Sequence, residues 1–421
     1  MNETKLINIA PGIDVLYLPT EKFHTFKIEA NFVAPQKLSE TTNRRLIANV
    51  LQRSNAAYPT EGLMSKKLAS MYGAELSSQA TIIQNVNILS FSINSIFNFN
   101  NYNVVPEALN FILESLLRPN LNSDRDQFNS DMFSIEKQNL NNVYASIKDD
   151  YALKATLEMK KMLYSNNLNL AVPAFGMKSQ LKDITAASLC DSYQTIIGDN
   201  RLIITAVGKL SEPDLNALLN SFDDFAQNYQ GVEFETNDFI DLPNDFIAKD
   251  HQEKINQSQI VLAYKFEGIF DRATILVLNY MLGGDDQALL FKNVREKNSL
   301  AYSIYSTLNA YQGYLLVQAG VSADKIEFAE KLIDQQIEFL RNQDLNNLMK
   351  HAQQALISRH QIMSDNISTH SNRLLIKALN ESAIIDEDDY VKRINNVKLA
   401  NVKKAASALK KIARYRLMGV L

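Results

Sequence analysis

The stretch Phe26-Lys27-Ile28-Glu29-Ala30-Asn31-Phe32-Val33 has the pattern of a β-strand, and residues 42–53 after it have that of a helix. Extended and helical patterns continue to alternate along the chain. Residues 75–83 and 87–93 can pair as a hairpin, and the amphipathic run 106–117 ends as a helix should before a proline. The chain therefore belongs to a mixed class, with both helices and strands.

The first predicted domain ends before a polar stretch. Residues 128–163 contain neither Gly nor Pro and predict one or two long helices, and residues 201–208 predict an apolar strand followed by a helix. The acidic stretch around residues 231–258 is interrupted by Pro243 and predicts an interdomain linker. The expected domains are then residues 1–230 and 259–421.

The second half repeats the pattern of the first. Residues 259–264 predict a strand and residues 272–282 a helix. Residues 46–51 match residues 276–281 at an offset of 230, and the strand around Phe91 matches that around Val317 at an offset of 226. A diverged internal duplication explains both matches; a chance likeness between apolar segments is the alternative.

Composition sets limits on the class of protein. The 421 residues are 46% hydrophobic and carry a formal charge of −4, so the net charge gives no reason to expect nucleic acid or membrane as a partner. Cys190 is the single cysteine and is expected to be an ordinary helix residue, because one thiol carries no mechanism without a placed base. The first residues lack the pattern of a secretory signal, so we expect a cytoplasmic location.

Three segments resemble the insulinase/pitrilysin metallopeptidase family. Residues 193–208 are similar to the family's helix, Asn turn and strand ending in Val-Gly, and residues 173–185 fit a further segment loosely. The most specific match is Arg295-Glu296-Lys297 followed by Leu300-Ala301-Tyr302, after a Gly-Gly pair. The resemblance covers nearly the whole chain as two tandem homologous domains. It implies an α+β fold in which each domain is a mainly antiparallel sheet packed against helices, a metallopeptidase-like half-clamshell.

The family's zinc motif is missing from this chain. Active members carry H-x-x-E-H on the first long helix, which places two His ligands and a general base on one face. Arg45, Ala48 and Asn49 stand at those positions, and Asn142 stands where the third ligand, a Glu, is expected. A guanidinium offers donors only, so Arg45 cannot bind zinc. The resemblance therefore implies a non-catalytic member, with no metal and no cofactor.

No other motif replaces the lost one. The five histidines, His24, His251, His351, His360 and His370, form no pair four residues apart. Asp285 and Asp286 follow a Gly-Gly pair and are expected to be turn or helix-capping residues. The basic residues of the C-terminal run are expected on the solvated face of an amphipathic helix, and these are Lys403, Lys404, Lys410, Lys411, Arg414 and Arg416.

The retained second-half motif implies a function shared with another chain. In the family, the Arg and Tyr that match Arg295 and Tyr302 bind the substrate backbone and help to stabilise the oxyanion. In two-chain bacterial relatives, one subunit carries the zinc motif and the other carries this pair. The resemblance thus implies a heterodimer with a homologous zinc-bearing peptidase subunit and a peptide substrate. A homodimer is an open possibility without that partner, and a non-catalytic scaffold protein is the alternative function.

Overall fold

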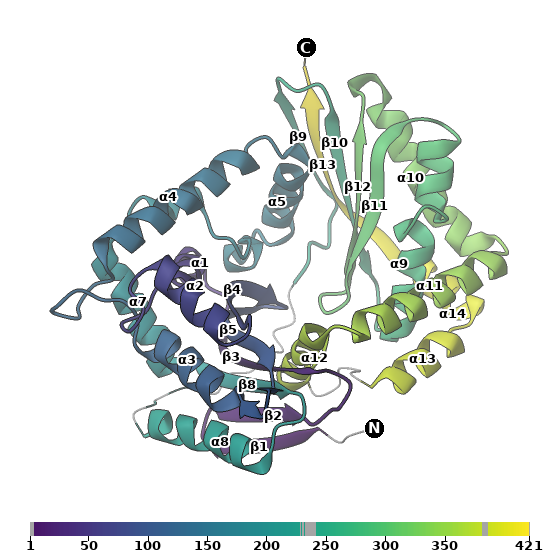
Figure 1. Cartoon of the computed structure of the whole chain (residues 1–421). Helices are drawn as coiled ribbons and strands as arrows, with labels where there is room; N and C mark the ends of the chain where they lie inside the picture. The colour runs from purple at the N-terminus through teal and green to yellow at the C-terminus, as the bar shows by residue number, and fades with distance from the viewer. Residues whose placement is uncertain (1–3, 228, 230, 232–240, 381–385, 421) are drawn as a thin grey trace. The chain divides into compact units, whose positions relative to one another are not determined.

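The computed structural model describes residues 4–227, 229, 231, 241–380 and 386–420. The contacts within the chain divide it into two compact units (Figure 1). The first unit comprises Met1–Ala145, Val172–Asp238 and Ser364–Ala383, and the second comprises Ser146–Ala171, Phe239–Met363 and Ile384–Leu421. Each unit contains one large sheet with helices packed against it, as the predicted α+β class requires.

The sheet of the first unit has six strands in the order β1-β2-β8-β3-β5-β4. Its strands are β1 (Lys5–Ala10), β2 (Ile13–Leu18), β3 (Thr25–Pro35), β4 (Glu75–Ile83), β5 (Val86–Ile96) and β8 (Arg201–Val207). Only β2 and β8 pair in parallel; the other described neighbours are antiparallel. The predicted strand at 26–33 and the predicted hairpin at 75–93 are confirmed as β3 and as the β4–β5 pair.

Helices and a small hairpin complete the first unit. They are α1 (Leu38–Arg53), α2 (Glu61–Ser70), the β6 (Asn98–Phe99) and β7 (Tyr102–Asn103) pair, α3 (Val105–Leu117), α4 (Ser130–Ile147), α6 (Lys178–Leu181), α7 (Ala186–Asp199), α8 (Glu212–Ala226) and α12 (Ile367–Leu379). Helix α1 packs on β4 and β5, and α7 packs on α1.

The sheet of the second unit has five strands in the order β11-β12-β10-β13-β9. Its strands are β9 (Ile247–Glu253), β10 (Ser258–Phe266), β11 (Ala301–Asn309), β12 (Tyr314–Val321) and β13 (Leu409–Gly419). The helices of this unit are α5 (Tyr151–Leu163), η1 (Leu168–Ala171), α9 (Arg272–Gly283), η2 (Phe291–Glu296), η3 (Ala323–Lys325), α10 (Ile326–Asn342), α11 (Asn346–Ser364), α13 (Glu387–Asn396) and α14 (Leu399–Ser407).

Five strands of the first sheet have the same topology as the five of the second, and β1 has no counterpart in the described residues. In each, a central strand pairs antiparallel with both neighbours, and the strand beyond one neighbour is added in parallel. β3, β5, β4, β8 and β2 of the first sheet therefore correspond to β10, β12, β11, β13 and β9 of the second. The matched residues 46–51 and 276–281 fall in α1 and α9, and the second match falls in β5 and β12. The chain thus consists of two similar halves.

Each half supplies one helix to the sheet of the other half. Helix α5 directly follows α4 in the chain but packs on β13 and β10 of the second unit. Helix α12 directly follows α11 but packs on β8 and β3 of the first unit. The single run predicted at 128–163 is accordingly two helices, α4 and α5, and the two belong to different compact units. The units therefore differ from the predicted domains 1–230 and 259–421 by these exchanged segments.

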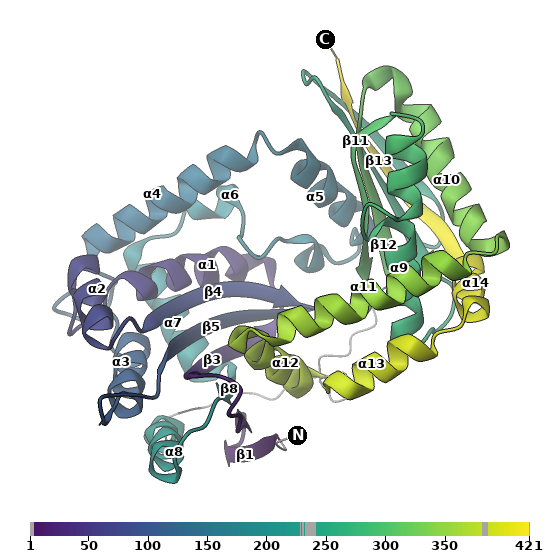
Figure 2. The same cartoon turned by 45° about the vertical axis from the view of Figure 1, so that its right-hand side comes forward.

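The second sheet is covered on both faces. Along β10, Ile260 and Leu262 join a core formed with α9, α10 and α14, whereas Val261 and Ala263 join a core formed with α5. Alternate residues of a strand point to opposite faces, so these two cores lie on opposite sides of one sheet. Figure 2 shows α5 on one side of this sheet and α9 and α10 on the other.

Helix α12 contacts the first sheet through buried polar groups. Ser371 Oγ donates to Glu29 Oε2 at 2.6 Å and lies 2.6 Å from Thr205 Oγ1. Lys27 Nζ donates to Ser368 Oγ at 3.2 Å and lies 3.8 Å from Glu29 Oε1. A buried carboxylate is tolerated only when it is paired and hydrogen-bonded. These contacts therefore give α12 one preferred position on β3 and β8.

Two predictions of local structure are wrong. Residues 247–253, placed in the predicted linker 231–258, form strand β9, which pairs in parallel with β13; residues 232–240 lie outside the described part. The C-terminal basic run is helical only at Lys403 and Lys404, because its remaining members lie on β13. There they form ion pairs, for example Arg416 with Glu330 and Lys410 with Glu267 at 3.5 Å.

We predict that Ser371→Ala lowers the free energy of unfolding by about 1–3 kcal/mol, because the buried Glu29 carboxylate loses a donor. Urea denaturation of the full chain measures this change. Ser358→Ala, at an exposed position of α11, is the matched control and should change the free energy by less than about 0.5 kcal/mol. Equal effects of the two substitutions would contradict the role of the α12 contact.

Candidate functional site

Helix α1 carries the positions that match the zinc motif. Arg45 and Asn49 are half-buried and lie one helical turn apart on the same side of the helix. Ala48 is completely buried in the core. At these three positions the helix therefore presents one guanidinium and one amide.

The side chain of Arg45 lies close to α4. Burial raises the pKa of Tyr144 to about 12, while a hydrogen bond with Thr42 and the charge of Arg45 act in the opposite direction. The Tyr144 hydroxyl donates to the carbonyl oxygen of Phe175 at 2.6 Å. Arg45 Nε is itself buried without a hydrogen-bond partner. A fixed positive charge thus faces α4 from the motif position.

Glu136 is a buried acidic group that feels this charge, and the sequence analysis did not select it. It is 3% exposed, and burial raises its pKa against the opposing effects of Arg53, Asn139 and Arg45. Arg53 Nε lies 3.4 Å from Glu136 Oε1. The sequence could have indicated that Glu136 is buried. Glu136, Leu140 and Tyr144 are spaced four residues apart, and together they lie on the buried side of α4.

Asn142 lies on the exposed side of α4. Its Oδ1 accepts a hydrogen bond from Gln138 Nε2 at 2.9 Å, one turn earlier. The buried side chains of α4 and Asn142 therefore point in different directions. The assignment of Asn142 to the lost third ligand stays a prediction.

The second motif begins in a π-helical turn, η2, that precedes strand β11. The backbone N–H of Lys297 donates to the Lys292 carbonyl oxygen, five residues back, at 2.9 Å. Ser299 then adopts a left-handed conformation with φ of 49°. π-Helical turns are rare and are found frequently at functional sites. The exposed Arg295 lies in this turn, and its guanidinium covers the Phe291 ring at 4.6 Å.

A β-bulge turns Tyr302 outward. In β11, Ala301 pairs with Val321 and Ser303 with Gly320, so that Tyr302 is the extra residue. Ile304 and Ser306 face the core, and without the bulge Tyr302 would share their side of the strand. With the bulge its side chain is 69% exposed.

The polar groups of both residues are free of protein partners within the described chain. Neither the Arg295 guanidinium nor the Tyr302 hydroxyl forms an intramolecular hydrogen bond or ion pair among residues 4–227, 241–380 and 386–420. Strand β11 is also an edge strand of its sheet, since it pairs only with β12 in the described residues. Two donors and an open strand edge are thus available to an external peptide.

Comparisons with known proteins relate this chain to inactive peptidases. Residues 183–354 match a family model described as the peptidase M16 inactive domain. The chain is 24% identical over 416 residues to the probable inactive metalloprotease YmfF of Bacillus subtilis (strain 168), covering 97% of this chain and 96% of that protein. The chain is therefore similar to inactive members of the insulinase/pitrilysin family.

Solved structures share the fold of this chain. A conserved protein from Enterococcus faecalis V583 superimposes with a TM-score of 0.92 at 24% identity over 99% of both chains. A peptidase M16 inactive domain from Pseudomonas fluorescens superimposes with a TM-score of 0.78 at 18% identity over 100% of this chain and 98% of that one. Within the described residues, no helix combines the length and apolar character that crossing a bilayer requires. The cytoplasmic location stays a prediction.

The residues present at the motif positions of α1 do not fit a zinc ion. The Arg45 guanidinium would repel the cation, and the Ala48 side chain has no donor atom. In the described ranges, no three His, Cys, Asp or Glu side chains gather into a possible metal site.

The remaining candidate residues have structural partners. His351 Nε2 lies 2.8 Å from Asp285 Oδ2, and His370 Nε2 lies 2.8 Å from the Ser364 carbonyl oxygen. Asp285 also accepts from the backbone N–H of Gln287, which confirms its predicted place in a turn. Cys190 is a buried residue of α7, as predicted.

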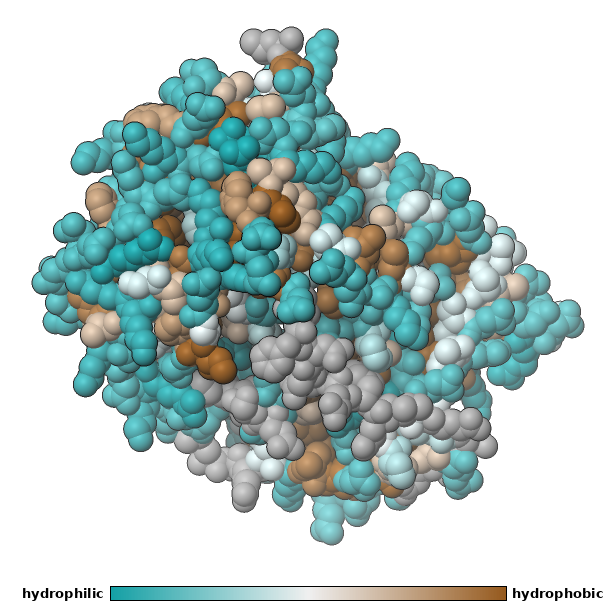
Figure 3. Space-filling view, turned by 180° about the vertical axis from the view of Figure 1, so that it is seen from behind, coloured by the Kyte–Doolittle hydropathy of each residue, from teal (hydrophilic) through white to brown (hydrophobic). Residues whose placement is uncertain are grey.

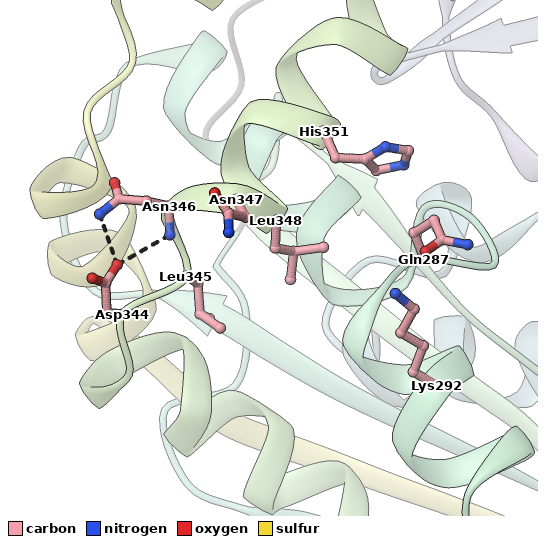
Figure 4. A pocket seen from close by; sticks show the side chains of 8 residues that line it. All are labelled: Gln287, Lys292, Asp344, Leu345, Asn346, Asn347, Leu348 and His351. Carbon is pink, nitrogen blue, oxygen red and sulfur yellow. Dashed lines mark hydrogen bonds between the residues drawn. The ribbon is translucent and has the colours of Figure 1, made fainter.

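A polar pocket of about 590 Å³ lies beside the start of α11 in the second unit (Figure 4). Gln287 and Lys292 line one side, and Asn347, Leu348 and His351 line the side formed by α11. Asp344 accepts hydrogen bonds from the backbone and side-chain nitrogens of Asn346, so its carboxylate stabilises the start of that helix. Lys292 is therefore the main charge that this pocket offers to a ligand.

The surface seen from behind is mainly hydrophilic. In Figure 3, hydrophobic residues form small groups that are separated by hydrophilic ones. Scattered apolar residues are normal on a protein surface. This face therefore does not indicate a large apolar interface.

We predict that Arg44→Met lowers the free energy of unfolding by about 2–3 kcal/mol. Arg44 is fully buried beside Arg45 and donates to Glu40, Asn200 and the Phe32 carbonyl oxygen, so its loss leaves buried acceptors unsatisfied. Chemical denaturation measures the change. Arg118→Met, at a side chain that is 70% exposed, is the matched control; an effect as large as that of Arg44→Met would contradict the prediction.

We also predict a pH-dependent effect of Glu136→Gln. Burial raises the pKa of Glu136 in the folded state, so the folded chain binds this proton more tightly than the unfolded chain, and stability falls as pH rises through that interval. The substitution should increase stability at neutral pH and lose this advantage near pH 4. Denaturation at both pH values tests it, and an equal effect at both would contradict the assigned cause.

Proposed function

We propose that this chain is the peptide-binding subunit of a two-chain peptidase. It would hold an extended peptide and present Arg295 and Tyr302 to the active centre of a homologous zinc-bearing partner. The observation that supports this most is the exposure of both side chains, without hydrogen-bonding partners in the described chain, beside an open strand edge. The inactive motif on α1 is consistent with a zinc ion supplied by the other subunit.

The chemistry of the pair suits this role. A guanidinium donates two parallel hydrogen bonds and keeps its charge at any physiological pH, and a phenol donates one more. Donors that are already placed when a carbonyl becomes an oxyanion stabilise the transition state. The water that attacks the peptide would be activated by the partner's zinc.

The peptide itself would bind as an added strand. In the described residues, β1 and β4 are the edge strands of the first sheet, and β9 and β11 are those of the second. An extended peptide can pair its backbone with such an edge, which gives affinity with little dependence on sequence. Strand β11 is the edge that carries Tyr302.

We predict that peptide hydrolysis appears only when this chain is mixed with a homologous H-x-x-E-H chain of the same organism. Arg295→Ala or Tyr302→Ala should then lower kcat of the mixture by about 10²–10³-fold, the usual cost of losing an oxyanion donor. Each chain alone and the mixture are assayed on the same fluorogenic peptides.

Lys331→Ala is the control for charge removal, because Lys331 is an exposed residue of α10 outside the Arg295 motif. A mixture that contains this control variant should keep its activity within about twofold of that of the unmodified mixture. A rise in KM at constant kcat would assign the pair to binding alone. A mixture no more active than the zinc-bearing chain alone would contradict the proposal and favour the scaffold function.

A further inference from the structure

The internal repeat locates a second position of interest. The offset of 230 brings Asn49 of α1 onto Asn279 of α9. Helices α5 and α12 both have 13 residues, and their first residues, Tyr151 and Ile367, are 216 positions apart. This second offset of 216 also brings Tyr144 of α4 onto His360 of α11. The region between α9 and α11 in the second half therefore corresponds to the zinc-motif region in the first half.

A pocket of about 450 Å³ lies at this position. Its walls come from α9, β11, α11 and α13, which neighbour one another within the second unit (Figure 2). The polar and aromatic residues that line it are Asn279, Tyr280, Tyr305, Ser306, Arg359, His360 and Tyr390. In the first half, Arg45, Glu136 and Tyr144 gather at the corresponding place.

A glycine pair shapes the floor of the pocket. A Cβ on Gly283 would lie 2.6 Å from the backbone nitrogen of Ser306, and one on Gly284 would lie 2.6 Å from the Tyr280 ring. Real Cβ atoms do not come so close, so only glycine lets the end of α9 approach β11. The residues that precede the Arg295 motif thus have a structural reason to be glycines.

The pocket has a positive charge at its entrance. Arg359 is exposed and forms no hydrogen bond or ion pair within the described residues. Burial and the Asp285 carboxylate raise the pKa of Tyr280, whereas the charge of Arg359 opposes the increase. Arg359 and Tyr280 both line the pocket, so the guanidinium can act on a group bound there. The Asp285 carboxylate has a partner of its own, because its Oδ2 atom lies 2.8 Å from His351 Nε2.

The rest of the pocket is aromatic and apolar. The His360 and Tyr390 rings stack with centroids 3.8 Å apart and planes at 8°. Leu276, Leu356 and Met363 complete the lining. Ligand sites are typically mainly apolar, with a few polar groups that orient the ligand, and occupy about 300–1,000 Å³.

We propose that this pocket binds a carboxylate attached to an aromatic or aliphatic side chain. The carboxylate would accept two hydrogen bonds from Arg359, since the planar guanidinium matches its two oxygens. The side chain would lie among the rings of Tyr280, Tyr305 and Tyr390. Both the carboxyl-terminal residue of a peptide and a free N-acylated amino acid have this chemistry. The site needs no second subunit and is independent of the function proposed for Arg295 and Tyr302.

Calorimetric titration of the full chain with N-acetyl-L-phenylalanine and with its amide tests the proposal. The acid should bind at least about tenfold more tightly, and Arg359→Gln should remove this preference. Arg118→Gln, which removes an exposed arginine in the first unit, should leave binding unchanged. Equal affinity for acid and amide, unchanged binding to the Arg359 variant, or tighter binding of inorganic phosphate than of the acid would overturn it.

A second variant changes a different residue that lines the same pocket. Met363 is 49% exposed, so Met363→Glu should fold normally and place a negative charge beside Arg359. It should weaken binding of the acid and not of the amide; an equal effect on both would contradict the proposed orientation. A short peptide ending in phenylalanine, with its terminus free or amidated, then distinguishes the two sources. Tighter binding of the free-terminus peptide than of N-acetyl-L-phenylalanine identifies a peptide terminus as the ligand.

Discussion

The structure depends on covering the second face of each sheet. An antiparallel sheet whose two faces are both apolar must bury both, and fully burying a Leu or Met side chain is worth about 1.5–3 kcal/mol. On the second sheet, Met159 and Leu163 of α5 pack on the face of Tyr415. On the first sheet, α12 performs the same role through Ser371 and its polar partners. The interleaved course of the chain follows from this requirement, because each half lacks a second-face helix for its own sheet.

The two motif regions differ in what they offer to a ligand. On α1, a guanidinium stands where a catalytic relative would hold a metal ion, and Glu136 and Arg53 lie buried or half-buried around it. This arrangement leaves no set of three metal-binding side chains among the residues that the structure describes. On β11, the bulge and the π-helical turn keep two donors at the surface. Bulges and π-helical turns occur frequently next to functional sites, which is a reason to connect these two with binding.

Much of the fold could be predicted from local patterns. Alternating and helical runs located β3, α1, the β4–β5 pair and α3 to within a few residues. The bulge at Tyr302 could not be predicted, because it depends on the register with β12. The helix predicted for the C-terminal basic run is wrong at residues 413–417. There Ala413, Tyr415 and Leu417 are buried and Arg414 and Arg416 are not, which is the period of two of a strand. The prediction rested on the basic residues alone and did not use this alternation. The helix exchange depends on contacts between distant segments and leaves no local signal.

The exchange of α5 and α12 has a consequence for the history of the chain. A single ancestral half would have had one sheet face without a helix and one helix without a sheet. A second copy could satisfy both needs at once by a reciprocal swap, which is the low-cost route by which identical protomers form symmetric dimers. Fusion of two such protomers would then give the present order of elements. In this light the tandem repeat is a dimer joined into one polypeptide, whose two parts were free to specialise because each still completed the other.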